Sequence, residues 1–237
     1  MKNFQQEDQE LLHKESSILT ASLQRRSFLQ YAGAGAAGIA LIAAGCKKDH
    51  SVDDSQRGLS LGTGDVGILN YAYALEQLEA AFYDFVVKNP YSNISATELA
   101  LLTDIRDHEV AHREFFKKAL GTGAIPALEV NFSTINFTLR DNVLATAKAF
   151  EDLGVSAYNG AGKLIKSADY LVLAGKIVSV EARHAALIRD LITQGSFADS
   201  TVIDANGLDA ARAPKDVLAI AQAYIKTPVN GSNLPTA

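Results

Sequence analysis

Two stretches of the chain place a glutamate three residues before a histidine. Glu109 precedes His112 in the first stretch, and Glu181 precedes His184 in the second. Because residues three apart lie on one face of a helix, both side chains of a pair can reach the same metal ion. Carboxylates and neutral imidazoles together are suitable ligands for iron or manganese. Each pair is therefore a candidate for half of a metal site.

A second repeat lies upstream of each pair. Glu76 precedes Tyr83 by two helical turns, and Glu151 precedes Tyr158 by the same interval. The chain thus consists of two similar stretches, each supplying a glutamate and then a Glu-x-x-His pair. One glutamate from each of two helices, with Glu-x-x-His from two others, is the ligand arrangement of a dinuclear carboxylate centre in a four-helix bundle. Four carboxylates would neutralise two divalent ions, whereas without metal their burial together would be unfavourable.

The elements that must position these residues are helices. Helical periodicity or capping signals predict four long helices and a short fifth, at about 64–88, 95–120, 139–166, 169–194 and 214–225. Ser95 and Glu98 form the signature of a capping box at the second start. The stretch from Thr122 to Thr138 lacks a helical period and is predicted to be a long connection between two antiparallel hairpins. We expect an all-α fold with no parallel sheet.

The motifs Leu-Glu-x-Leu-Glu-Ala-x-Phe-Tyr at 75–83 and Val-Glu-Ala-Arg-His-Ala at 180–185 resemble the ferritin-like superfamily. More narrowly, they are similar to the ferritin-like domain family that includes desiccation-related proteins, over about 65–227. The resemblance implies an up-down-down-up bundle, with a long crossover between the second and third helices. It also implies a centre of two iron or manganese ions bound by Glu76, Glu109, His112, Glu151, Glu181 and His184.

Four further residues leave alternatives open. Glu79 could replace or supplement Glu76 as the ligand from the first helix, although the internal repeat favours Glu76. Tyr83 and Tyr158 are either core aromatics or donors to a ligand carboxylate on a neighbouring helix. His108 is expected to bond a partner or to be exposed rather than to bind metal, because it would point about 100° away from Glu109 on a helix.

The first 46 residues resemble an export leader. Arg25 and Arg26 precede an apolar run of small residues from 31 to 45, as in a twin-arginine signal. The run spans roughly 22 Å as a helix, short of the roughly 30 Å hydrocarbon layer of a bilayer. It ends at Cys46 in a sequence that resembles a lipoprotein processing box. We expect a signal peptide over 1–46 and a lipid on Cys46. A flexible tether over 47–64, the bundle over 65–195 and a C-terminal extension over 196–237 would follow. The alternative is an uncleaved N-terminal anchor.

Composition narrows the functions further. The 237 residues carry a net charge of −5 and a single cysteine. A nucleic-acid partner is not expected, because such binding depends on clustered lysine and arginine. One cysteine excludes an internal disulfide and a cysteine-based metal cage.

We expect an exported, membrane-anchored lipoprotein of the bacterial cell envelope, in the periplasm or at the surface. It would oxidise Fe(II) with oxygen or peroxide, or remove peroxide; the alternative is a structural or stress-protective protein with a non-catalytic metal. Oligomeric state is left open, with a homodimer as one arrangement.

Overall fold

The structure is a computed structural model that describes residues 58–236. The predicted export signal at Arg25 and Arg26 and the predicted lipid attachment at Cys46 lie outside the described residues. Within the described part of the chain, none of the helices combines the length and apolarity needed to cross a membrane.

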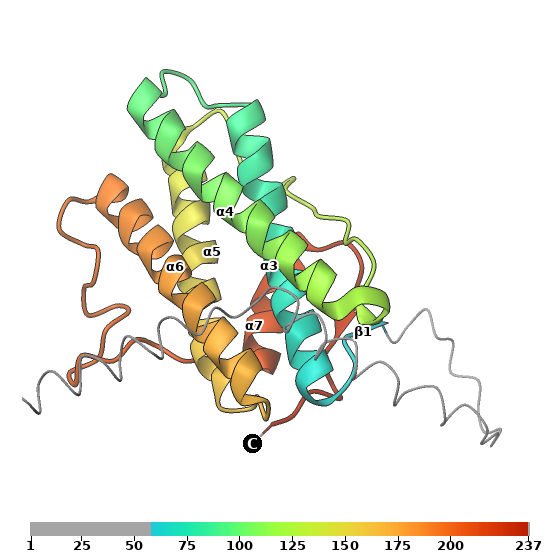
Figure 1. Ribbon diagram of the computed structural model, residues 1–237. Helices are drawn as coiled ribbons and strands as arrows, with labels where there is room; N and C mark the ends of the chain where they lie inside the picture. The colour runs from blue at the N-terminus through green and yellow to red at the C-terminus, as the bar shows by residue number, and fades with distance from the viewer. Residues whose placement is uncertain (1–57, 237) are drawn as a thin grey trace, which may run out of the picture. The chain divides into compact units, whose positions relative to one another are not determined.

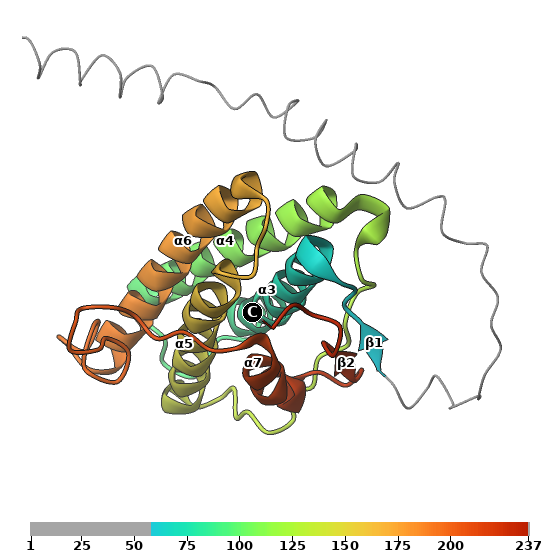
Figure 2. The ribbon, with the colours of Figure 1, turned by 90° about the horizontal axis from the view of Figure 1, so that it is seen from below.

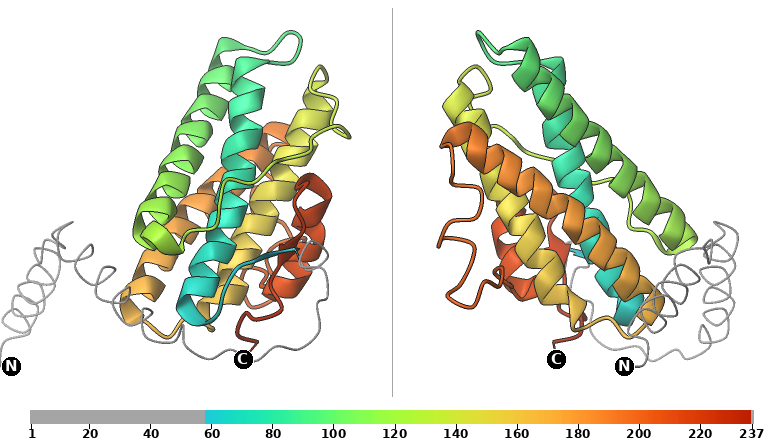
Figure 3. Two further views of the ribbon diagram at one scale, coloured as in Figure 1. Left: turned by 90° about the vertical axis from the view of Figure 1, so that its right-hand side faces the viewer. Right: turned by 60° about the vertical axis from the view of Figure 1, so that its left-hand side comes forward.

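Four long helices form two packed antiparallel pairs (Figure 1). The chain runs up α3 and down α4, then down α5 and up α6, so the predicted all-α bundle with up-down-down-up order is confirmed (Figure 3). A short fifth helix, α7, follows near the C-terminus, where the sequence predicted one. The helices span Gly64–Lys88 (α3), Ala96–Leu120 (α4), Arg140–Gly162 (α5), Ala168–Ile192 (α6) and Pro214–Ala221 (α7).

Burial divides the four long helices into two inner and two outer ones. Most side chains of α3 are buried, and α5 is buried along its second half. By contrast, the only buried residues of α4 are Leu102, Ile105, Glu109 and Phe116, spaced at three, four and seven residues on a single stripe. A helix buried on one stripe faces the core with few side chains, so the placement of Glu109 on that stripe directs it inward.

The start of α4 follows the predicted capping signal in part. The Ser95 hydroxyl accepts a hydrogen bond from the backbone N–H of Glu98 at 3.1 Å, which satisfies one of the free donors at a helix start. The Glu98 carboxylate does not return to Ser95, as a complete capping box requires. Instead it accepts hydrogen bonds from the Tyr91 hydroxyl and from Nε of Arg140. It therefore ties the start of α4 to the start of α5.

The long connection between α4 and α5 is held along the bundle by two buried amides of α3. The Asn70 side chain donates to the carbonyl of Gly123 at 2.9 Å and accepts from the N–H of Ile125 at 2.9 Å. Further along, the Gln77 side chain accepts from the N–H of Leu128 at 2.8 Å. These bonds give the connection partners for its backbone polar groups, although it forms no helix or strand of its own beyond the 3₁₀ turn Gly121–Gly123.

A two-stranded parallel ladder closes the C-terminal end of the fold. Strand β1, Leu59–Ser60, pairs with β2, Val229–Asn230, beside α7 (Figure 2). The expectation of no parallel sheet is therefore wrong for these two short strands, which the sequence did not predict. The packing also begins within the stretch predicted as a tether, since Leu61 is fully buried. Each strand has only two residues, too few for a pattern of alternating polarity to be recognised.

Candidate metal centre

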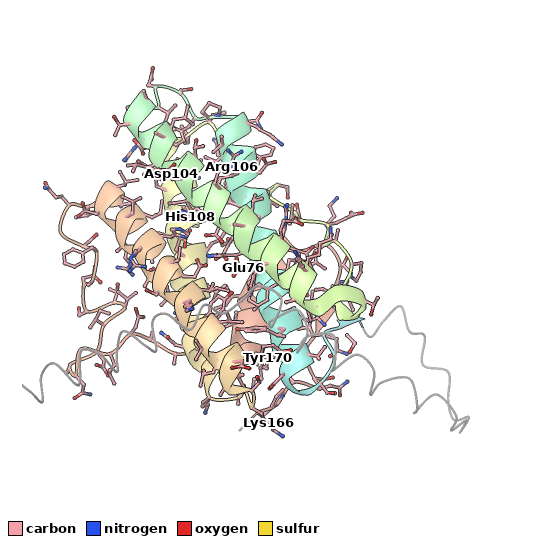
Figure 4. The ribbon with its side chains drawn as sticks, viewed as in Figure 1. Glu76, Asp104, Arg106, His108, Lys166 and Tyr170 are labelled. Carbon is pink, nitrogen blue, oxygen red and sulfur yellow. The ribbon has the colours of Figure 1, made fainter. Side chains whose placement is uncertain are left out.

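All four long helices contribute acidic or imidazole side chains to one buried cluster. Figure 4 shows Glu76 inside the bundle, between the helices. The four carboxylates at its centre are each 0% exposed, which is unusual for glutamate unless it is paired or bound to metal. The cluster consists of Glu76 from α3, Glu109 and His112 from α4, Glu151 from α5, and Glu181 and His184 from α6. The structure therefore brings together all six residues predicted as ligands.

The six residues form two groups of four that share two members. In each group, one potential ligand atom from every residue lies within 4.8 Å of the others. Glu109 and Glu181 belong to both groups. One group is completed by Glu76 and His112, and the other by Glu151 and His184. The geometry thus suits two neighbouring cations, with the two Glu-x-x-His glutamates between them and Glu76 and Glu151 at the ends.

The cluster's polar atoms face a common space without forming hydrogen bonds to one another. Nδ1 of His184 lies 2.7 Å from Oε1 of Glu109, and Nδ1 of His112 lies 2.9 Å from Oε1 of Glu181. Neither contact has the direction of a hydrogen bond, so the attraction is Coulombic. Of the nine buried side-chain atoms without a hydrogen-bond partner in residues 58–236, all but the Tyr71 hydroxyl belong to this cluster: Glu76 Oε2, Glu151 Oε2, both carboxylate oxygens of Glu109 and of Glu181, and Nδ1 of His112 and His184.

Buried polar atoms without partners are rare in folded proteins, and a bound ion is one of the accepted explanations. Within the cluster, the eight atoms without partners are carboxylate oxygens and imidazole nitrogens. Both are ligands for divalent iron and manganese. The six side chains therefore fit a dinuclear centre in number, chemistry and direction.

Two tyrosines support the terminal carboxylates in a reciprocal manner. The Tyr83 hydroxyl, on α3, donates to Oε1 of Glu151 on α5 at 2.6 Å. The Tyr158 hydroxyl, on α5, donates to Oε1 of Glu76 on α3. Each bond leaves the second oxygen of the glutamate facing the cluster. Of the two alternatives for these tyrosines, the structure therefore has the carboxylate donor, and the rings also belong to the hydrophobic core.

Without metal, burial and the neighbouring charges shift the pKa values of the cluster's carboxyl groups in different directions. Burial raises the pKa of Glu76, and the nearby charge of Glu181 raises it further. Burial likewise raises the pKa of Glu151 to about 8. For Glu109 burial acts in the same direction, but His112 and His184 outweigh it and lower the pKa to about 2.

The two imidazoles show the opposite balance. Burial opposes their protonation, but the surrounding carboxylates outweigh it and raise the pKa of both His112 and His184 to about 12. Without metal, both imidazoles are therefore cations at neutral pH, and Glu76 and Glu151 carry protons. The crowded cluster can stay buried without metal because the protons on these four groups balance the carboxylate charge that bound cations would otherwise neutralise.

Glu79 lies outside both groups of four. It is buried, and burial and the charge of Glu109 raise its pKa. A Cβ added at Gly154 on α5 would lie 3.0 Å from Oε1 of Glu79, so the glycine leaves room for this carboxylate. Between the alternatives for α3, the geometry selects Glu76 for the cluster and places Glu79 beside it.

His108 is both exposed and bonded to a partner, in agreement with the sequence interpretation. Its Nδ1 lies 2.9 Å from Nε2 of His184, and the two rings are nearly parallel. The sequence could not identify this partner, because the two residues lie 76 positions apart on different helices.

The family match agrees with this architecture. The ferritin-like domain family matches residues 64–194, a stretch that contains all six residues of the cluster, and the chain belongs to that family. A comparison with curated proteins found no match. The protein is thus a ferritin-like helical bundle with a buried Glu/His cluster that could bind metal ions.

Proposed function

We propose that the cluster holds two iron or manganese ions and that the protein oxidises Fe(II), or consumes peroxide, in the cell envelope. The observation that carries this proposal is the set of eight buried carboxylate and imidazole atoms that lack hydrogen-bond partners. Glu76 and His112 would hold one ion, Glu151 and His184 the other, with Glu109 and Glu181 shared between them. When bound, the metals would supply electrons for the reduction of oxygen or peroxide.

The chain's own residues have distinct tasks in this proposal. Tyr83 and Tyr158 orient the terminal glutamates by binding the oxygens that face away from the cluster. The two shared glutamates would balance half of the charge of two divalent ions, and Glu76 and Glu151 would balance the rest. The surrounding helices exclude water from the carboxylates, and the imidazoles must release their protons before they can bind metal. His112, whose side chain is 14% exposed, lies nearest to solvent among the six.

The alternative is a structural or stress-protective protein that retains metal only for stability. The complete burial of the four carboxylates favours this reading, because a catalytic centre needs a route for its small substrate. Metal analysis of natively purified protein, followed by oxygen and peroxide consumption assays with Fe(II), separates the two functions. Turnover selects the enzyme, whereas two bound ions without turnover select the structural protein.

Two variants on α4 make this test specific. Glu109→Gln should abolish metal binding at both positions, since Glu109 belongs to both groups. Glu114→Gln is the matched control, because this side chain is exposed and, within residues 58–236, its one ion pair is with Arg113. If Glu109→Gln retains two ions per chain, as Glu114→Gln should, then the cluster is not where the metal binds and the proposed centre fails.

We also propose export and lipid attachment at Cys46, on the strength of the twin arginines and the processing box. Cys46→Ser should release the protein from membranes, and replacement of Arg25 and Arg26 by lysine should block export. A Cys46→Ser protein that stays in carbonate-washed membranes would favour the uncleaved anchor instead.

A further inference from the structure

The two halves of the cluster are related by an internal repeat, but one contact is present in only one of them. Nδ1 of His184 faces the carboxylates, while Nε2 of the same ring meets Nδ1 of His108 at 2.9 Å. His108 is exposed, on α4 where this helix faces α6 (Figure 4). The outer nitrogen of a buried imidazole is thereby connected to a group that reaches solvent.

The other half has no such contact. In the repeat, His112 corresponds to His184, and the residue that corresponds to His108 is the one before Glu181. That residue is Val180, which has no side-chain acceptor. Within residues 58–236, Nδ1 of His112 faces the carboxylates as Nδ1 of His184 does, but no side chain bonds its Nε2.

This difference matters for metal binding because a neutral imidazole carries one proton. A histidine that binds metal through Nδ1 must keep its proton on Nε2, and a partner that accepts this proton fixes both the tautomer and the ring orientation. Nδ1 of His108 can be that acceptor if its own proton is on Nε2. His108 therefore holds the ring of His184 in the metal-binding orientation before the ion arrives, and keeps the Nε2 proton in place once Nδ1 has released its own, whereas His112 depends on solvent for the same bond.

We propose that His108 is a positioning residue that makes the two metal positions unequal. The position formed by Glu151 and His184 binds its ion more tightly and fills first, and the position formed by Glu76 and His112 fills second. This inference rests on the proposed dinuclear centre. Loss of a partner of this kind typically lowers metal affinity by about 10- to 100-fold, which sets the separation expected between the two steps.

Titration of the metal-free protein with Co(II), followed by visible absorption, tests the proposal. The unaltered chain should bind two ions in steps separated by about 10- to 100-fold. His108→Val introduces the residue type found at the corresponding position, Val180, and should lower the affinity of the first binding step to that of the second. His108→Asn should restore the separation, because its amide oxygen can accept the same proton. Asp104→Asn, one turn away on the exposed side of α4, should change nothing.

A second measurement reports the tautomer directly. In the Zn(II)-loaded protein, an NMR signal from the Nε2 proton of His184 should be observed, and His108→Val should lose it through exchange with water. If the unaltered protein binds no cobalt, the dinuclear centre itself is refuted. If it binds two ions equally well, or if His108→Val keeps the two steps apart, the centre stands and the role of His108 is overturned.

Discussion

Loading the cluster with two divalent ions should release about four protons per chain at pH 7. The pKa values near 12 make His112 and His184 cations in the metal-free protein, and the raised pKa values of Glu76 and Glu151 leave both protonated. Each of the four must lose one proton to bind metal. Glu109, with a pKa of about 2, has none to release. Because the pKa of Glu151 is about 8, the release should fall to about three protons at pH 9.

Calorimetry of Co(II) or Zn(II) binding in buffers of different ionisation enthalpy measures this number. Glu151→Gln should release about one proton fewer at pH 7, while the exposed Glu114→Gln should match the unaltered protein. A release of one proton or none, with two ions bound, would mean that the imidazoles are neutral in the metal-free protein. The charge distribution derived from the cluster would then be wrong.

Three further outcomes are expected. Tyr83→Phe removes the 2.6 Å hydrogen bond to Glu151 and should weaken metal binding by about 10- to 100-fold in chelator competition; unchanged affinity would leave the tyrosine a core residue only. Gly154→Ala should gain less in urea denaturation than Gly175→Ala, which gains about 1 kcal/mol of helix propensity in open space, because the Glu79 carboxylate crowds position 154; equal gains would count against that crowding. The metal-free protein should lose stability between about pH 5 and pH 9, because the native state raises the pKa values of both cluster imidazoles and of Glu151, so their contributions are complete below the unfolded pKa values and decline above them. A urea series showing a rising profile would contradict this.

The helices and the members of the cluster could be predicted because their signals are local. Periodicity and capping residues fixed the four long segments to within a few residues, and the interval of three placed each histidine with its glutamate. The choice between Glu76 and Glu79 could not be made with the same certainty, because both lie on the extensively buried helix α3. What distinguishes them is their contacts with other helices: Glu76 belongs to a group of four, whereas Glu79 lies outside both groups, next to Gly154 of α5.

Features that depend on contacts between distant segments could not be predicted from the sequence. The sharing of Glu109 and Glu181 between the two groups follows from how α4 and α6 meet, not from any spacing in the chain. The same holds for the bond between His108 and His184, and for the hold of Asn70 on the long connection. In each case the residue type indicated a capacity for bonding, and the partner was supplied by tertiary packing.

The exchange of partners between the two hairpins bears on how such a centre could arise. The group containing Glu76 and His112 takes Glu181 from the other hairpin, and Tyr158 of that hairpin supports its terminal glutamate. Neither hairpin alone holds a complete group of four. An ancestral single hairpin could therefore have bound metal in this way only as a pair of chains. Fusion of two copies through the long connection would have made the pairing permanent, and each copy could then diverge at single positions such as 108 and 180.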